Sequence, residues 1–532
     1  MPLPVYPPDL AGEWSRLRRS VRSTYTSSQR RGPLPETAGT ARSDAPREDP
    51  AESTGLDERT HDVRSLGAVG DGVNDDGAVL QAALDRAGEE GGGVVRVPGG
   101  VYSVRSPPLR IHGNTRVSLA PDAVVRRDGG SPLLTNGPAG DTGQGNILLE
   151  GGVWDGNGSE IPGRDVVMSF QHATGLTLRD TVVRDAPGTH AIALVGSRRV
   201  RLVGVRCEGG IGSEEGPSSA AAVHLGSHPS EGELTGEAPI CSDVAVIDCV
   251  FTASETPGVA PWPTGVEAHG SASAKGHQDV RILGCRFEGC SREGVRVSAE
   301  DGVVVQGNTF PNCAGGVAVT SRAAAVTAGT RPLETVIVEN VFTDLGELPA
   351  VRLAGRVDDE RVGHAMVAGN IVHGGGGDGV RVHRARSLVC SNNLLDGLGG
   401  TGLHLDDVES SSATVNMITD VGEDGLLLVD VRNTAITANT LRGAGRDGLR
   451  IQGGEALRGT DNRLEGVSSV GARVGGGTTG LVLTGNRMDG TVRGLSIDET
   501  CRDVVRHGND LRGSGGLDDA SLDPVTDPAD LV

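Results

Sequence analysis

The stretch that decides the fold lies at residues 379–497 and repeats one phrase: Gly379-Val-Arg-Val, Gly402-Leu-His-Leu, Gly425-Leu-Leu-Leu, Gly448-Leu-Arg-Ile, Gly471-Ala-Arg-Val and Gly494-Leu-Ser-Ile. An asparagine keeps the same spacing, at Asn370, Asn393, Asn416, Asn439, Asn462, Asn486 and Asn509. The copies lie 23 residues apart, with one step of 24, and this period fits neither heptads nor the longer helical repeats. Within each phrase the apolar residues alternate, as they do in a β-strand. We therefore predict an all-β fold, a parallel β-helix solenoid with about 23 residues per turn.

Composition agrees with such a coil and limits its partners. The chain has 532 residues, of which 83 are glycine, and aromatic residues make up 2 %. Because a solenoid grows by adding turns, this length does not require several globular domains. The net charge of −21 argues against nucleic acid as a partner, since binding to a phosphate backbone needs positive charge.

The eight cysteines contain no Cys-x-x-Cys pair. Cys249 and Cys285 occupy the position that Asn308 and Asn370 hold in later turns. We therefore expect buried thiols that act as small apolar side chains rather than a zinc site. No cofactor is predicted, with calcium as the one ion left open.

Four segments are expected along the chain: a helical docking or oligomerisation segment over residues 1–34, a flexible linker over 35–60, the β-helix over 61–512 and an acidic tail over 513–532. In the first segment an apolar seam runs through Leu10, Trp14, Leu17 and Val21, with arginines beside it. A weak amphipathic helix that is disordered on its own remains the alternative. No run of 18 apolar residues is present, so no membrane span is predicted, and the start of the chain has no apolar core of a secretory signal.

A short helix is expected where the β-helix begins. Asn74 or Asp75 can cap its start, its apolar residues are Val79, Leu80, Ala83 and Leu84, and Gly91 to Gly93 end it. A strand then starts at Val94. Such a helix would cover the exposed first turn of the coil.

This region resembles a known superfamily. Gly67-Ala68-x-Gly70-Asp71-Gly72-x-x-Asp75-Asp76, Gln81-Ala82-Ala83 and Val97-Pro98-x-Gly100-x-Tyr102 resemble the N-terminal signature of the pectate lyase and polygalacturonase β-helix superfamily. The stretch from Leu149 to Gly158 (LEGGVWDGNG) resembles its Gly-Gly-x-x-Asp-Gly-x-Gly turn. The resemblance covers about residues 61–510 and implies a single-stranded, right-handed parallel β-helix. Enzymes, epimerases and phage tailspikes share this opening, so it does not select a chemistry.

The catalytic phrases of the polygalacturonases are not found in this sequence. It has no Asn-Thr-Asp, Gly-His-Gly or Arg-Ile-Lys, and the pectate lyase calcium arrangement is not recognisable. No catalytic residue is therefore carried over by resemblance.

Outward-facing columns are the places where chemistry is expected. Counted from the repeated glycine, positions +1 and +3 point inward and +2 and +4 point to solvent, and neighbouring strands stack about 4.8 Å apart. In order along the coil, the +2 column is Ala193, His224, Glu267, Arg296, Ala318, Arg352, Arg381, His404, Leu427, Arg450, Arg473 and Ser496. Its five arginines are either a track for an anionic polymer, such as a uronate glycan, or strand residues neutralised by nearby Asp and Glu.

Two clusters on this face combine acid–base types. The first contains His224, Glu267, His269 and Arg296, beside an insertion over 226–262 that holds Trp262; the second contains Arg352, Arg381, His383, His404, Asp406 and Asp407. A carboxylate beside His and Arg can act as a general acid or base. As catalytic candidates we take Glu267, His269, His224 and Asp406; as substrate-binding candidates Arg296, Arg352, Arg381, His404, Arg450, Arg473 and Trp262. Asp155 beside Trp154 is expected to be a turn residue.

Three functions remain open. The first is a tailspike-like protein of a phage or phage-like particle, a homotrimer that docks to a baseplate or tail protein through residues 1–34. It would bind an anionic cell-surface polysaccharide, with or without cleaving it. The second is a free carbohydrate-active enzyme, a lyase, glycoside hydrolase or epimerase. The third is a non-catalytic structural rod.

Overall fold

The computed structural model describes residues 59–130, 132–137, 144–163, 166–210, 220–226, 240–269, 277–298, 301–320, 334–355, 361–522, 525–526 and 530–531. The expectations for residues 1–34, and for the linker up to residue 58, lie outside the described residues.

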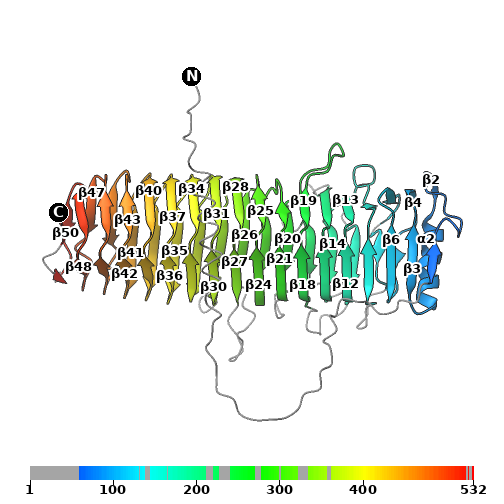
Figure 1. The fold of residues 1–532 in the computed structure, drawn as a ribbon, viewed down its shortest axis with the longest axis horizontal. Coiled ribbons are helices and arrows are strands. Elements are labelled where there is room, and N and C mark those ends of the chain that lie inside the picture. Colours follow the sequence, from blue (N-terminus) through cyan, green and yellow to red (C-terminus); the bar gives the residue numbers. More distant parts are fainter. Residues whose placement is uncertain are drawn as a thin grey trace, which may run out of the picture. The chain divides into compact units, whose positions relative to one another are not determined.

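The described chain coils into a parallel β-helix with three sheets, as the repeat predicted (Figure 1). Sheet A runs from β1 (Thr60–Asp62) to β51 (Val525–Thr526), and sheet B from β2 (Asp71–Asp75) to β49 (Asp510–Gly513). Sheet C runs from β5 (Leu109–Arg110) to β50 (Leu517–Asp519). Among the described residues the largest sheet has 18 strands and the smallest 16.

Sheet C carries the candidate residues. Between its first and last strands it contains β8 (Leu134–Thr135), β11 (Met168–Gln171), β14 (His190–Val195), β17 (Ala221–Gly226), β20 (Thr264–His269), β23 (Glu293–Ser298), β26 (Gly315–Thr320), β29 (Val351–Ala354), β32 (Val380–Arg386), β35 (Leu403–Glu409), β38 (Leu426–Arg432), β41 (Leu449–Glu455), β44 (Val470–Gly475) and β47 (Arg493–Ile497).

A regular turn of the coil contains one strand from each sheet. One such turn consists of β33 (Leu388–Ser391), β34 (Leu394–Leu398) and β35. Leu403 of β35 pairs with Val380 of the turn before and Leu426 of the turn after, each 23 residues away. The sequence period is therefore the length of one turn.

The core is built of small apolar side chains and stacked rings. Phe251, Phe287, Phe310 and Phe342 stack with centroids 4.7 to 4.8 Å apart. All eight cysteines are free and buried, and burial raises the pKa of Cys390 to about 12. They pack as apolar side chains, as expected.

Buried asparagines form a hydrogen-bonded ladder at the corner between sheets A and B. The ladder runs from Asn308 through Asn340 and the seven repeated asparagines. In a typical step the Oδ1 of Asn439 accepts from both the main-chain N (3.0 Å) and Nδ2 (3.0 Å) of Asn416. Asp530 takes the last place and accepts from Asn509. Each amide thus satisfies backbone groups that the corner removes from the sheets.

The N-terminal helix is present but starts one or two residues later than the expected cap at Asp75 or Asn74 implies. It is α2 (Gly77–Glu89), with Asp76 in the capping position. Asp76 does not cap α2 with its side chain; its carboxylate accepts from the main-chain N atoms of Val69 (2.7 Å) and Gly70 (3.0 Å). Asp76 therefore holds the Gly-rich turn, and Asp75 bonds Gly77 N at 3.0 Å. The apolar side of α2 packs against the first strands of the coil.

The coil continues beyond Arg512, where an acidic tail was expected. Strand β50 pairs with β47, and β51 pairs with β48 (Val505–His507). Two of the aspartates in this stretch pair with Arg506, whose guanidinium reaches both Asp519 (2.7 Å) and Asp530. In the described part of the chain, no helix has the length and apolarity needed to cross a membrane.

Candidate functional site

The strand register brings the +2 residues together in the expected order. Glu267 lies between His224 and Arg296 in the register, and Arg381 lies between Arg352 and His404. The column continues through Leu427 to Arg450 and Arg473. The sequence-derived column is thus one continuous line on sheet C.

The five arginines of this column are neutralised by carboxylates. The nitrogen-to-oxygen distances are 3.6 Å for Arg296–Glu267, 3.5 Å for Arg352–Glu293, 3.7 Å for Arg381–Asp378, 3.9 Å for Arg450–Asp424 and 2.7 Å for Arg473–Asp447. Four of these carboxylates come from a single column, the residue just before the repeated glycine. Of the two alternatives, this geometry favours arginines that are paired within the protein.

The aspartates of this acidic column also join successive turns. Asp378 accepts from Thr401 N (2.8 Å) and Asp447 accepts from Val470 N (3.0 Å). Burial acts to raise the pKa of Asp447, but the hydrogen bonds from Arg473 and Val470 N outweigh it, so the pKa lies below its ordinary value. At Asp424, burial dominates and raises the pKa. These carboxylates therefore have a structural function.

The first cluster is assembled but covered. Glu267 lies 4.0 Å from His224 and is only 1 % exposed, and the ring of His224 stacks on His190 with centroids 4.2 Å apart. The expectation that Glu267 and His224 face solvent is wrong, because the strand face is buried there. His269 ends β20, and its side chain lies outside the described part of the molecule.

Trp262 does not line a groove, which corrects the sequence expectation. Its side chain is 1 % exposed, and Nε1 donates to the carbonyl oxygen of Cys207 at 3.1 Å. The ring packs so closely over Gly210 that a Cβ atom there would lie 2.9 Å from it. Trp262 is therefore a core residue and offers no stacking surface for a ligand.

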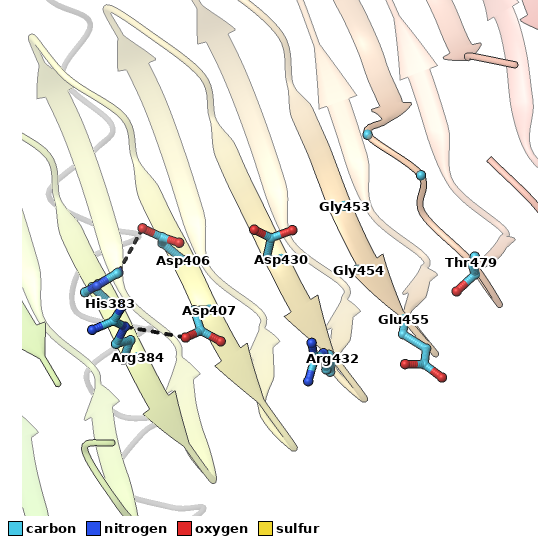
Figure 2. Close-up of a pocket in the computed structure, with 12 residues that line it drawn as sticks. His383, Arg384, Asp406, Asp407, Asp430, Arg432, Gly453, Gly454, Glu455 and Thr479 are labelled. Atoms are coloured by element: carbon cyan, nitrogen blue, oxygen red, sulfur yellow. Dashed lines mark hydrogen bonds and ion pairs between the residues drawn. The ribbon is translucent and has the colours of Figure 1, made fainter. Parts of the chain in front are cut away.

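Part of the second cluster lines a pocket of about 620 Å³ (Figure 2). The pocket lies where strands β32, β35, β38 and β41 end. Its lining residues are His383, Arg384, Asp406, Asp407, Asp430, Arg432, Gly453, Gly454, Glu455, Gly476, Gly477 and Thr479. Arg352, Arg381 and His404 belong to the column beside it, where His404 lies 3.6 Å from Asp378.

The pocket forms at one position of the strands of sheet C. In three successive turns this position holds a residue with positive φ, which bends the strand, and in the next two turns it holds glycine. Arg384, Asp407 and Asp430 have φ angles of 55°, 51° and 49°, in the left-handed region. In the next two turns the same position is glycine, Gly453 (φ 78°) and Gly476. The absent side chain at Gly453 leaves room for the carboxylate of Asp430, because a Cβ there would lie 2.4 Å from Oδ1 of Asp430.

Acidic side chains dominate the pocket. Nδ1 of His383 lies 2.8 Å from Oδ2 of Asp406. The side chain of His383 is 39 % exposed and that of Asp406 is 33 % exposed. Asp407 is held by Arg361 (2.6 Å) and Arg384 (3.6 Å). Asp430 is exposed and lies on the strand next to Asp406 (Figure 2). This pairing of histidine and carboxylates is suited to acid–base chemistry.

Several lining residues were missed from the sequence. Asp430, Arg432 and Glu455 were not selected, because only positions +2 and +4 were searched. The signal that could have found them is the column Arg384, Asp407, Asp430, Gly453, whose residue types favour positive φ.

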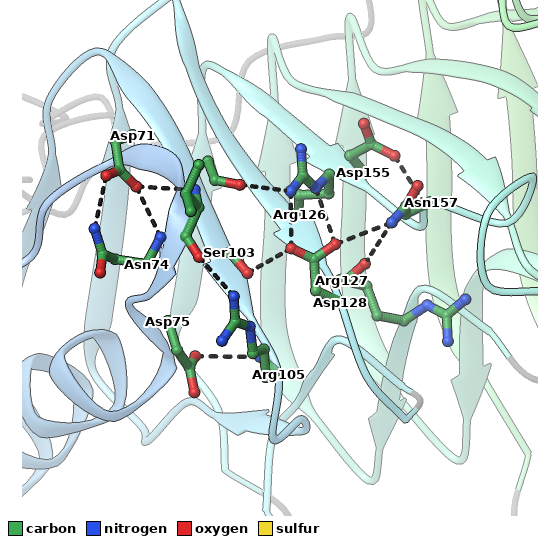
Figure 3. Close-up of polar contacts among 12 residues, drawn as sticks. Asp71, Asn74, Asp75, Ser103, Arg105, Arg126, Arg127, Asp128, Asp155 and Asn157 are labelled. Carbon is green, nitrogen blue, oxygen red and sulfur yellow. Dashed lines mark hydrogen bonds and ion pairs between the residues drawn. The ribbon is translucent and has the colours of Figure 1, made fainter.

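Asp155, which was expected to be a turn residue, has both carboxylate oxygens bonded within the protein. It accepts from Asn157 N at 2.8 Å, and Arg184 pairs with its other oxygen at 2.7 Å. Figure 3 shows the neighbouring network, in which Arg126 pairs with Asp128. Trp154 is buried beside it. Within the described ranges, no group of three or more His, Cys, Asp or Glu is placed to hold a metal ion.

Comparisons with known proteins agree with the fold. Residues 356–509 match the model of the right-handed β-helix region, and residues 60–118 match that of the rhamnogalacturonase A/epimerase, pectate lyase-like family. The predicted right-handed parallel β-helix of the pectate lyase-like superfamily is confirmed.

Individual relatives are more distant. Plasmin and fibronectin-binding protein A of Streptococcus pneumoniae is 25 % identical over 362 residues, 58 % of this chain and 50 % of that protein. A structure of this surface protein and adhesin superposes with a TM-score of 0.56 and 18 % identity, covering 75 % of this chain and 99 % of that one. Mannuronan C5-epimerase AlgE4 of Azotobacter vinelandii is 52 % identical over 44 residues, 8 % of either chain. The chain thus spans about half the length of the streptococcal relative.

Proposed function

We propose that this protein binds a polysaccharide along sheet C and holds one of its sugar residues in the pocket at His383 and Asp406. The observation that carries the proposal is the pocket itself. Its volume of about 620 Å³ lies in the range of ligand pockets, and carboxylates, guanidinium groups and bare glycine backbone line it. Such a lining can exchange many hydrogen bonds with sugar hydroxyl groups.

The pocket also supports cleavage as a second step. Asp406 is hydrogen-bonded to His383, whereas no histidine in the described ranges is hydrogen-bonded to Asp430 on the neighbouring strand. Two carboxylates in different surroundings are suited to separate acid and base roles.

A panel of bacterial wall and capsule polysaccharides tests this function. Binding is measured by calorimetry, and cleavage by new reducing ends together with the ultraviolet absorbance of unsaturated uronate. Reducing ends alone indicate hydrolysis, and absorbance with them indicates a lyase. Binding that is lost in Asp406→Asn supports the proposal. If no polysaccharide binds, or if Asp406→Asn binds as the wild type does, the proposal is wrong.

Binding to a host protein is the second candidate function. It is supported by the 25 % identity with the plasmin- and fibronectin-binding protein of S. pneumoniae. Surface plasmon resonance with immobilised plasmin and fibronectin tests it. Saturable binding to either protein, unaffected by Asp406→Asn, would favour this candidate over the polysaccharide.

A further part of the proposal is that the protein is attached to a phage or phage-like particle, as a tailspike is. It rests on the sequence of residues 1–34, whose apolar seam favours a homotrimer or a docking contact with a particle protein. Light scattering on the full chain and on a chain that starts at Gly55 tests it. A trimer that becomes a monomer on removal of the segment supports this form; two monomers that fail to associate with particles contradict it.

A further inference from the structure

We infer that the polymer held by the pocket carries amino groups rather than carboxylates or phosphates; this inference rests on the proposed polysaccharide function. It replaces the anionic polymer that the arginine column predicted from the sequence. Three observations carry it: the internal pairing of the arginines, the surplus of carboxylates in the pocket, and the position of the two carboxylates without an arginine.

The arginines of sheet C are already engaged. Each of the five in the +2 column has a carboxylate oxygen within 4 Å, at distances from 2.7 to 3.9 Å. To bind a polyanion these guanidinium groups would have to give up or share partners such as Asp447, which is 3 % exposed. Leaving a buried carboxylate without its cationic partner is unfavourable, because its charge is then uncompensated. The column is therefore a poor track for a polyanion.

The pocket beside this column has excess negative charge. Its lining contains four carboxylates and two guanidinium groups, and Arg361 adds a third guanidinium at Asp407, which leaves one negative charge with His383 counted as neutral. Arg384 is directed to Asp407, and Arg432 stands between Glu409 and Glu455 in the strand register. A carboxylate or phosphate on the ligand would meet repulsion in this space.

Asp406 and Asp430 are the groups that remain for a ligand. Within the described ranges, no arginine lies within ion-pair distance of either carboxylate, and both are accessible from the pocket. At Gly477, which also lines the pocket, an added Cβ would meet no atom within 4 Å, so open space for a sugar ring remains on this side of the pocket. An ammonium group on the sugar would satisfy both carboxylates by charge-assisted hydrogen bonds. The net charge of −21 attracts such a polymer from a distance.

The test measures the affinity of the full chain for three soluble probes of similar length: partly deacetylated chitosan oligosaccharides, dextran oligosaccharides and oligogalacturonate. Calorimetry is run at about 20 mM and about 300 mM NaCl. The higher salt concentration screens long-range attraction to the net charge but weakens direct contacts in the pocket less. Asp406→Asn and Asp430→Asn are compared with Asp396→Asn. Asp396 makes the same 2.8 Å contact with a histidine, His373, on sheet B and does not line the pocket.

We expect chitosan to bind most tightly and oligogalacturonate least. Each pocket variant should weaken chitosan binding by about tenfold, the effect of losing about 1.4 kcal/mol, and Asp396→Asn should bind as the wild type does. Tightest binding to oligogalacturonate would overturn the inference and leave the polysaccharide function standing. Equal chitosan binding by all three variants would also overturn it, because the attraction would then come from overall charge. Failure of all three probes to bind would overturn the proposed function, and the inference with it.

Discussion

The Nδ1 atom of His383 and the Oδ2 atom of Asp406 lie 2.8 Å apart on sheet C, and the same two turns of the coil carry a second pair, His373 and Asp396, at 2.8 Å on sheet B. Only the first pair lines the pocket. The two pairs share chemistry, spacing and position along the coil, so a difference between their variants reports on the pocket.

Asp406→Asn should abolish or weaken ligand binding by at least about tenfold with little effect on stability. A half-exposed ion pair contributes about 0 to 1 kcal/mol, so the melting temperature should change as little as it does in Asp396→Asn. Calorimetric binding and thermal melting of both variants check this. A similar loss of binding in Asp396→Asn would show that the pocket is not the site.

Glu267→Gln should lower stability rather than remove a catalytic group. Glu267 is 1 % exposed and lies 3.6 Å from Arg296 and 4.0 Å from His224. Removing its charge leaves these partners beside a neutral amide, which should cost about 1 to 3 kcal/mol. Denaturant unfolding measures this loss, with ligand affinity measured alongside on the folded variant. A variant of wild-type stability that no longer binds or cleaves would restore Glu267 as a site residue.

Asp447→Asn and Asp424→Asn should change stability with opposite dependence on pH. The pKa of Asp447 is lowered on folding, so its ionised form stabilises the fold above about pH 4, the unfolded pKa, and this contribution disappears as pH falls through the folded pKa. The disadvantage of Asp447→Asn should therefore be largest at neutral pH and shrink in acid. Asparagine keeps the acceptor for Val470 N, which isolates the charge.

For Asp424 the sign is reversed. Its pKa is raised on folding, so the folded state binds the proton more readily and the wild type loses stability as pH rises through the folded value. The free energy of unfolding of Asp424→Asn, relative to that of the wild type, should thus be highest at neutral pH and lowest in acid. Urea unfolding from about pH 3 to pH 7 checks both variants. Parallel pH profiles for the two variants would contradict the assignment.

Asn439→Ala should destabilise the coil by about 2 to 5 kcal/mol, because it leaves several buried groups without partners. The lost bonds include those to Asn416 and from Nδ2 to the carbonyl oxygen of Ala413 (2.9 Å). Asn433→Gly is the control, since Asn433 lies in the same turn, is exposed and has a φ of 44°, which glycine adopts without strain. Chemical denaturation of both variants compares them, and equal losses would show that the ladder does not stabilise the corner.

The period of the sequence was enough to predict the coil, the turn length and the order of the outward columns. Arg381 follows Arg352 and precedes His404 in the register because backbone pairing repeats with the chain. The asparagine ladder was predictable for the same reason, although Asn340 was not recognised as its member. Local chemistry and regular hydrogen bonding are properties of each repeat, and the repeat is visible in the sequence.

Alternation and period are set by neighbours along the chain, so the order of amino acids was enough to predict the fold, the facing of each strand and the candidate columns. Which of those residues a ligand can reach became visible only in the folded coil. Glu267 and Trp262 became buried, and the arginines met carboxylates from a column three residues away or on another turn. The pocket arose where glycines follow Asp430 in the stack. Burial, ion pairing and empty space depend on which side chains from different turns share a volume, and that is fixed only when the coil closes.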